Sequence, residues 1–351
     1  MSTSSSNAIG RREAIVTGAA ALGLLVIVRL AIMLAGPGLT GVLGGWGVDR
    51  DFGYAWNQLK IRHDEPVDWY LVGSSRLGMG VDVDAFADEM GVDRDRVEKL
   101  TFSAGTPWEV WQLIKLRPDE FAKARGIVVD VGAWQFNANA PTRFGERFPR
   151  LASWDDRVKL ADESDDRRAN PVDRIWPYQS QRRTIMDWLS AVWHTVDPDA
   201  PTSTHDKEWG AHEARVQKQG MPINATPDAA YERHFANFAW SPLVEDSLRE
   251  LATWCNEHRL QLILVRPPTS TSYHQQILEN EASANGYRKM LKLLDELASG
   301  AGAMLILDTT ADAMQLGTDD EIFLDYGHLS RQGGKAYTRS LVQRIKANLP
   351  H

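Results

Sequence analysis

Two short segments, far apart in the sequence, carry residues that could act together as a nucleophile, a base and an acid. Near the C-terminal end, Asp325 stands three residues before His328, just ahead of a helical pattern. A carboxylate can hold an imidazole in one tautomer and direct its other nitrogen toward a hydroxyl group. Ser75 supplies that hydroxyl, because it follows the apolar run 69–72 and Gly73, which permits a tight turn. The combination predicts a Ser-His-Asp triad that performs acyl transfer.

The elements that must position these groups follow from the pattern of apolar residues. Short buried-strand patterns alternate with helical patterns along most of the chain, which predicts an α/β fold: a three-layer sandwich with a central parallel sheet of about five strands. In such a sheet the reactive groups gather at the carboxyl ends of the strands. Strands are expected at 69–72, 100–102, 127–131, 261–265 and 303–307, and helices at 83–90, 108–116, 243–257, 275–298 and 331–349.

The segment around Ser75 resembles the Gly-Asp-Ser block of the SGNH (GDSL-like) hydrolases. The likeness is greatest to their membrane-anchored envelope branch, which includes alginate O-acetyltransferase-like and D-alanyl-transfer-like proteins. Ser74 stands here in place of the aspartate, so the resemblance implies that Ser75 is the nucleophile and that the sheet is flavodoxin-like. The family's second-block glycine matches Gly105, although the usual preceding asparagine is absent, and its third-block asparagine matches only the later Asn137. The resemblance thus implies an oxyanion hole made by Ser75, Gly105 and Asn137.

Arg266 closes the fourth expected strand, just before two prolines, and so falls at the same edge of the sheet. One hypothesis is that its cation binds an anionic group of the substrate; a structural ion pair is the favoured reading. The triad chemistry requires no cofactor and no metal. The histidines between residues 194 and 234 lack the spacing of metal ligands.

Composition and charge restrict the class of protein. The chain has 351 residues with 43% hydrophobic content, which is ordinary for a globular core. Its net charge of −8, with no stripe of basic and aromatic residues, argues against nucleic acid as a partner. The single cysteine, Cys255, excludes an internal disulfide and is most simply a core residue.

The N-terminal region predicts a membrane anchor. Residues 14–35 form an apolar stretch of 22 residues whose one charge is Arg29, and about 20 such residues cross a bilayer. Arg11 and Arg12 precede it, whereas acidic residues follow it, so the N-terminus is expected in the cytoplasm and the rest of the chain on the outer face. A cleaved signal peptide is the alternative.

The expected organisation is therefore a single-pass protein of the cell membrane with one large exported domain. About a hundred residues, 138–240, separate the third and fourth expected strands and are predicted to form an insertion that acts as a lid; a core-packing segment is the alternative. The expected parts are a cytoplasmic tail (1–12), a transmembrane helix (13–36), a linker (37–66) and an SGNH-like domain (67–351).

The function expected from these features is that of a membrane-anchored, exported serine esterase or O-acyltransferase. By family analogy its substrate is an ester-linked acyl group of an envelope glycan or lipid, and its partners are envelope acyl-transfer proteins. The alternative from another class is a non-catalytic protein on the SGNH scaffold that binds or delivers glycan. A third reading, a soluble binding protein with a removed signal, predicts release from the membrane.

Overall fold

The centre of the protein is a five-stranded sheet in which every strand pair is parallel. The computed structural model describes residues 23–24, 27, 66–140, 151–153, 155–156, 158–159, 226–308, 310 and 316–349. The strand order is β2-β1-β3-β4-β5, so strand β1, which directly precedes Ser75, lies between two neighbours. The strands are β1 (Trp69–Ser74), β2 (Val97–Phe102), β3 (Gly126–Asp130), β4 (Gln261–Arg266) and β5 (Met304–Leu307). The predicted α/β fold with five parallel strands is confirmed.

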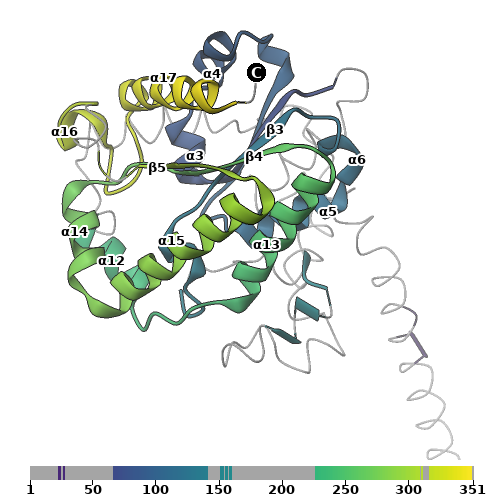
Figure 1. Cartoon of the computed structure of the whole chain (residues 1–351). Helices are drawn as coiled ribbons and strands as arrows, with labels where there is room; N and C mark the ends of the chain where they lie inside the picture. The colour runs from purple at the N-terminus through teal and green to yellow at the C-terminus, as the bar shows by residue number, and fades with distance from the viewer. Residues whose placement is uncertain are drawn as a thin grey trace, which may run out of the picture.

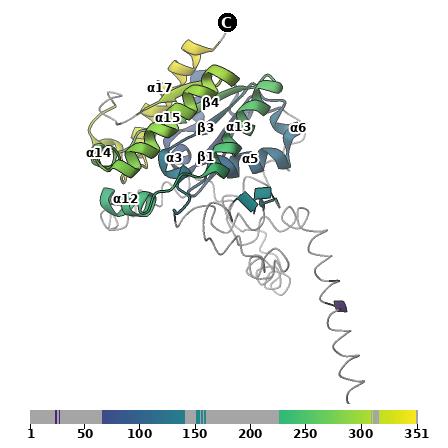
Figure 2. The same ribbon diagram turned by 60° about the horizontal axis from the view of Figure 1, so that its bottom comes forward.

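Helices cover both faces of this sheet, which gives three layers (Figure 1). Helices α4 and α17 lie on one face, and α5, α13 and α15 lie on the other, as the turned view also shows (Figure 2). The helices are α3 (Ser75–Gly80), α4 (Val83–Met90), α5 (Pro107–Leu116), α6 (Pro118–Phe121), α12 (Pro227–Phe235), α13 (Pro242–Glu257), α14 (Thr271–Glu279), α15 (Glu281–Ala301), α16 (Asp319–Ile322) and α17 (Arg331–Asn348), with short 3-10 turns η1 (Arg94–Arg96) and η2 (Ala133–Phe136).

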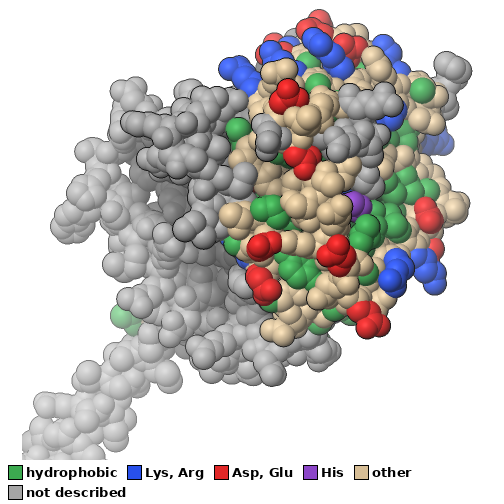
Figure 3. Space-filling view, turned by 90° about the vertical axis from the view of Figure 1, so that its left-hand side faces the viewer, with side chains coloured by type: hydrophobic (Ala, Val, Ile, Leu, Met, Phe, Trp, Pro, Cys, Tyr) green, Lys and Arg blue, Asp and Glu red, His purple; other side chains and the backbone are tan. Residues whose placement is uncertain are grey.

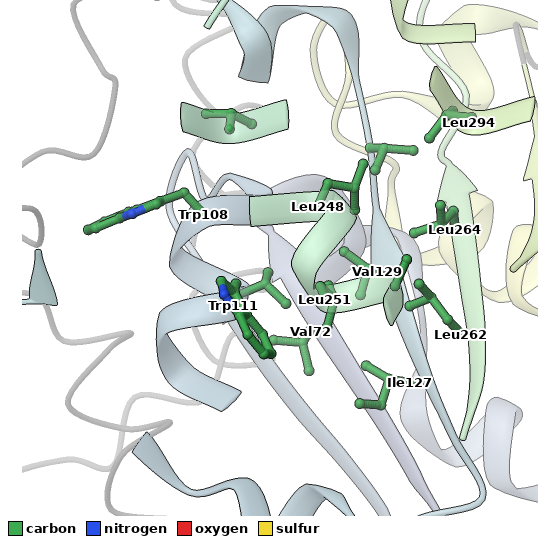
Figure 4. Close-up of a cluster of buried hydrophobic side chains, with 14 of the residues drawn as sticks. Val72, Trp108, Trp111, Ile127, Val129, Leu248, Leu251, Leu262, Leu264 and Leu294 are labelled. Atoms are coloured by element: carbon green, nitrogen blue, oxygen red, sulfur yellow. The ribbon is translucent and has the colours of Figure 1, made fainter. Parts of the chain in front are cut away.

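The two cores follow from the alternation of side chains along each strand. In β1, Tyr70 and Val72 enter the core under α5 and α13, whereas Trp69 and Leu71 enter the core under α4 and α17. A parallel sheet that is buried on both faces needs such continuous apolar strands. Each fully buried aliphatic side chain stabilises the fold by about 1.5–3 kcal/mol. Figure 4 shows part of the first core, where strand residues Val72, Ile127, Val129, Leu262 and Leu264 face helix residues Trp108, Trp111, Leu248, Leu251 and Leu294.

One helix prediction is wrong. A single helix was expected over 275–298, but the chain forms α14 and α15, which are separated at Asn280. The backbone of Asn280 is extended, with φ −90° and ψ 125°, and its side chain accepts a hydrogen bond from the N–H of Ala282. A short polar side chain that caps a helix start in this way ends the preceding helix, even where the apolar spacing continues.

The last part of the expected insertion packs onto the domain. Trp240 stacks on Phe136 with ring centroids 4.5 Å apart, and Trp240 also forms an isolated antiparallel bridge with Asn137. Most of residues 141–225, on which the lid hypothesis depends, lie outside the described residues.

The expected tail, transmembrane helix and linker, residues 1–66, likewise lie almost wholly outside the described part of the chain. Within the residues that the structure describes, no helix has both the length and the apolar character needed to cross a bilayer.

Candidate active site

The turn that presents Ser75 is fixed from the neighbouring strand. Strand β1 ends at Ser74, which donates from its N–H and its Oγ to the two carboxylate oxygens of Asp130, each at 2.5 Å. The Oγ of Ser74 also accepts from the N–H of Arg76 at 3.2 Å and so caps α3, whose first residue is Ser75. A Cβ on Gly73 would stand 1.8 Å from Asp130 Oδ1, so only glycine fits there. The predicted turn therefore depends on a buried carboxylate at the end of β3.

The structure brings the three predicted triad residues together. Ser75 Oγ lies 2.8 Å from His328 Nε2, although the two residues are 253 positions apart. On the other side of the ring, His328 Nδ1 lies 2.7 Å from Asp325 Oδ2. An ionised carboxylate can only accept, so Nδ1 carries the proton and Nε2 is left to accept the hydroxyl proton of Ser75. This is the order of hydrogen bonds that nucleophilic activation requires.

The electrostatic environment keeps Asp325 ionised. Burial alone would raise its pKa, but the charge and hydrogen bond of His328 and the N–H groups of Gly327 and His328 lower the pKa to about 2. The ordinary value is 3.8. A carboxylate held in this state stabilises an imidazolium on His328.

The loop that carries His328 is closed by backbone hydrogen bonds. The N–H of Leu324 donates to His328 O at 2.8 Å, and the N–H of Ser330 donates to Ile322 O at 2.7 Å. The side chain of Ser330 accepts from the N–H of Gly333 and caps α17. The predicted helix start after the Asp-x-x-His segment thus helps to hold His328 in place.

Two predicted oxyanion donors are directed elsewhere. Gly105 lies beside the turn before Ser75, since a Cβ on it would be 2.9 Å from Gly73 O, but its N–H donates to Phe102 O at 3.1 Å in a tight turn. The carboxamide of Asn137 donates to His234 O at 2.8 Å and accepts from the N–H of Ala239 at 3.1 Å. The donor roles predicted for Gly105 and Asn137 are therefore not supported, because both groups stabilise loops; the backbone amide of Ser75 remains.

The substrate-binding hypothesis for Arg266 is not supported, because its side chain is engaged inside the fold. Its guanidinium is buried, and it donates through Nη1 to Tyr287 Oη at 3.0 Å and to Asp308 O at 2.9 Å. Its Nη2 lies 2.9 Å from His274 Nδ1, which accepts because a guanidinium has only donors. Burial and the nearby Arg266 lower the pKa of His274 to about 4. Arg266 is a structural residue between β4 and α14.

Sequence reasoning missed a buried polar and aromatic cluster behind the triad. His234 lies 2.6 Å from Tyr273 Oη through Nδ1 and stacks on Trp134 with centroids 4.9 Å apart. Burial and the positive charge of Arg76 lower the pKa of His234 well below its usual range. The cluster also contains Tyr326, whose ring lies 6.1 Å from that of His328. Only the position of Arg76 directly after Ser75 could have indicated it.

Asp130 should give the protein a distinct dependence of stability on pH. Burial raises the pKa of Asp130 to about 6 from 3.8, and the hydrogen bonds from Ser74 limit the rise. The native state then holds a proton that the unfolded state releases, so the free energy of unfolding should fall by ~3 kcal/mol as pH rises from about 4 to 6. Denaturant unfolding between pH 4 and 7 should show this slope in the wild type and lose it in Asp130→Asn.

The exposed helix residue Asp88 provides the control, because Asp88→Asn should keep the slope. An unchanged slope in Asp130→Asn would show that Asp130 is not the responsible group.

The surface on the side of helices α14 and α16 carries side chains of several chemical types. Helices α14 and α16, which follow β4 and β5 in the chain, lie on the side that Figure 3 displays. Its described part carries acidic groups and a histidine among apolar and uncharged side chains, and Lys and Arg lie toward its rim.

Comparison with known proteins does not identify the site. The sequence matches no protein-family model, and no curated protein matches it. The chemistry must therefore be inferred from the residues. A serine hydroxyl bonded to an imidazole that a carboxylate orients is suited to attack on a carbonyl carbon.

Proposed function

We propose that the protein is a serine esterase or O-acyltransferase of SGNH type that acts through Ser75, His328 and Asp325. The observation that supports this most strongly is the pair of hydrogen bonds at 2.8 and 2.7 Å that joins the three side chains in catalytic order. The place of Ser75 after the β1 strand and the resemblance of its segment to the Gly-Asp-Ser block support the same proposal.

The proposed reaction is a two-step acyl transfer. His328 Nε2 takes the proton of Ser75 while Oγ attacks the ester carbonyl, and Asp325 stabilises the imidazolium. The tetrahedral oxyanion, which the backbone N–H of Ser75 can meet, collapses with transfer of the proton from His328 to the leaving alkoxide. Water or a sugar hydroxyl then attacks the acyl-serine, with His328 again as the base. Water gives hydrolysis, whereas a hydroxyl gives O-acylation.

The proposed location of the domain is the outer face of the cell membrane. The apolar stretch 14–35 and the arginines before it support a single-pass anchor with the N-terminus in the cytoplasm. From that position the accessible substrates are ester-linked acyl groups of envelope glycans or lipids. Envelope acyl-transfer proteins are the partners that fit such a reaction.

The test is labelling of the full chain, in detergent or in membranes, with a fluorophosphonate probe and turnover of p-nitrophenyl acetate. We expect the wild type to be labelled and Ser75→Ala to lose both labelling and turnover. Ser299→Ala is the matched control, because Ser299 lies exposed on α15 and donates only to Asp295 O in the structure. Ser74→Ala is unsuitable, since Ser74 binds Asp130 and caps α3.

A second function, glycan binding without turnover on the same scaffold, is favoured by one observation. The N–H of Gly105 and the carboxamide of Asn137 are both engaged in loops, which leaves fewer donors for an oxyanion. A folded wild-type protein that is neither labelled nor active, but binds envelope glycan, would support this function over the enzyme. Release of acetate with or without transfer to an added oligosaccharide would separate esterase from transferase.

A further inference from the structure

The guanidinium of Arg76 is held inside a box of three aromatic rings. Arg76 is 7% exposed, and its Cζ lies 5.5 Å from the ring of Trp134, 5.5 Å from that of Tyr273 and 5.4 Å from that of Tyr326. The rings come from η2, from α14 and from the loop that carries His328. The side chain next to the nucleophile thus joins three separate segments of the fold.

This cation is buried without a direct ion pair among the described residues, although its charge acts on Asp130 and opposes the rise of the pKa of that carboxyl. Arg76 forms no ion pair with any residue that the structure describes, and its Nη2 is buried without a hydrogen-bond partner. Burial opposes its charge, but the phenol groups of Tyr273 and Tyr326 raise the pKa of Arg76, so it stays protonated. Burial of a charge without a direct ion pair is costly, and an apolar side chain of similar volume would avoid the cost. Stability alone does not account for an arginine here.

The guanidinium also touches the backbone between the acid and the base. A Cβ on Gly327 would stand 3.0 Å from Arg76 Nε and 3.2 Å from Arg76 Cζ. Gly327 does not have a positive φ, so its backbone would accept alanine, and the three atoms nearest to such a Cβ all belong to Arg76. The N–H of Gly327 donates to Asp325 Oδ1 at 2.9 Å. Arg76 therefore packs against the peptide that orients the catalytic carboxylate.

We propose that Arg76 is a positioning residue that sets the distance between Ser75 and the Asp325-x-x-His328 loop. Its backbone belongs to the helix of the nucleophile, and its planar head is wedged between the aromatic box and Gly327. Arginine suits this place because a planar guanidinium stacks on several rings at once, whereas the ammonium of lysine does not. The inference rests on the proposed chemistry of Ser75, and it predicts an effect on kcat rather than on KM.

The first test compares Arg76→Met and Arg76→Lys with the wild type on p-nitrophenyl acetate. We expect Arg76→Met to lose roughly 10²-fold in kcat, as a misplacement of about 1 Å does, with KM within about threefold. Its Tm should be unchanged or higher, because a buried charge is removed. Arg76→Lys should recover part of kcat. Arg339→Met is the matched control, since the Arg339 side chain is 65% exposed on α17 and should leave kcat and KM unchanged.

The second test is a double-mutant cycle with Gly327→Ala. The added methyl group must displace the guanidinium, so we expect about a tenfold loss of kcat in the wild type and almost none in the Arg76→Met background. An Arg76→Met protein with normal kcat, or an equal loss from Gly327→Ala in both backgrounds, would overturn the inference.

Failure of the proposed function is distinguishable from failure of this inference. A wild-type protein that is not labelled at Ser75 would refute the proposed function. In that case the free energies of unfolding of the wild type, Arg76→Met, Gly327→Ala and the double variant test the contact between residues 76 and 327. Coupling between the two substitutions supports this contact, and additivity overturns it.

Discussion

Replacement of Asp325 by asparagine is expected to lower kcat for ester hydrolysis by roughly 10⁴-fold. The amide keeps the size of the side chain but loses the charge that stabilises the His328 imidazolium. It can also donate to Nδ1 and so favour the tautomer in which Nε2 carries the proton and cannot accept from Ser75. The measurement is the kcat of the purified full chain on p-nitrophenyl acetate. Asp84→Asn, at a side chain that is 83% exposed, should keep the wild-type rate.

Asp325 should also affect how stability depends on pH, in the direction opposite to that expected for Asp130. The pKa of Asp325 is depressed in the folded protein, so its contribution is present above pH 4 and is lost as pH falls from about 4 to 2. In Asp325→Asn the free energy of unfolding should therefore fall by ~2 kcal/mol less than in the wild type over this pH range. A mutant with near wild-type kcat would exclude the triad, whatever its stability.

Replacement of Gly73 by alanine should be the most destabilising small substitution in the sheet. The new methyl group would collide with Asp130, which is buried and holds the Ser74 backbone and hydroxyl. Because the carboxylate cannot move without breaking both hydrogen bonds, we expect a loss of about 3–5 kcal/mol in the free energy of unfolding. Equilibrium denaturation measures it.

Gly300→Ala is the matched control for this prediction. Gly300 lies in α15 with open space where its Cβ would stand, so alanine there should be neutral or stabilise by up to ~1 kcal/mol. Equal behaviour of the two variants would contradict the role assigned to Asp130.

The parts of the site that could be predicted are those that the sheet positions. Ser75 follows the first strand, and the loop of Asp325 and His328 follows the last, so the parallel topology brings them to one edge. The pattern of apolar residues is enough to indicate the strands, because a strand that is buried on both faces is a nearly continuous apolar run in the sequence.

The parts that could not be predicted depend on partners distant in the sequence. Asn137 is the first asparagine after β3, but its amide is bound by the backbone near α12, about a hundred residues away. Arg266 lies at the expected carboxyl end of β4, yet its guanidinium donates to Tyr287 Oη and Asp308 O inside the fold. The aromatic box around Arg76 produces no recognisable pattern in the sequence, because its three rings come from three separate segments.

The separation of 253 positions between Ser75 and His328 also links activity to the completion of folding. Strand β1 lies inside the sheet and pairs with β2, the next strand in the sequence, whereas the segment with His328 follows β5, the last strand. Contacts between such distant residues form late, because the entropy of closing the intervening chain must be lost first. We therefore expect a partly folded chain to present Ser75 without His328, so the proposed ester chemistry should require the completed fold.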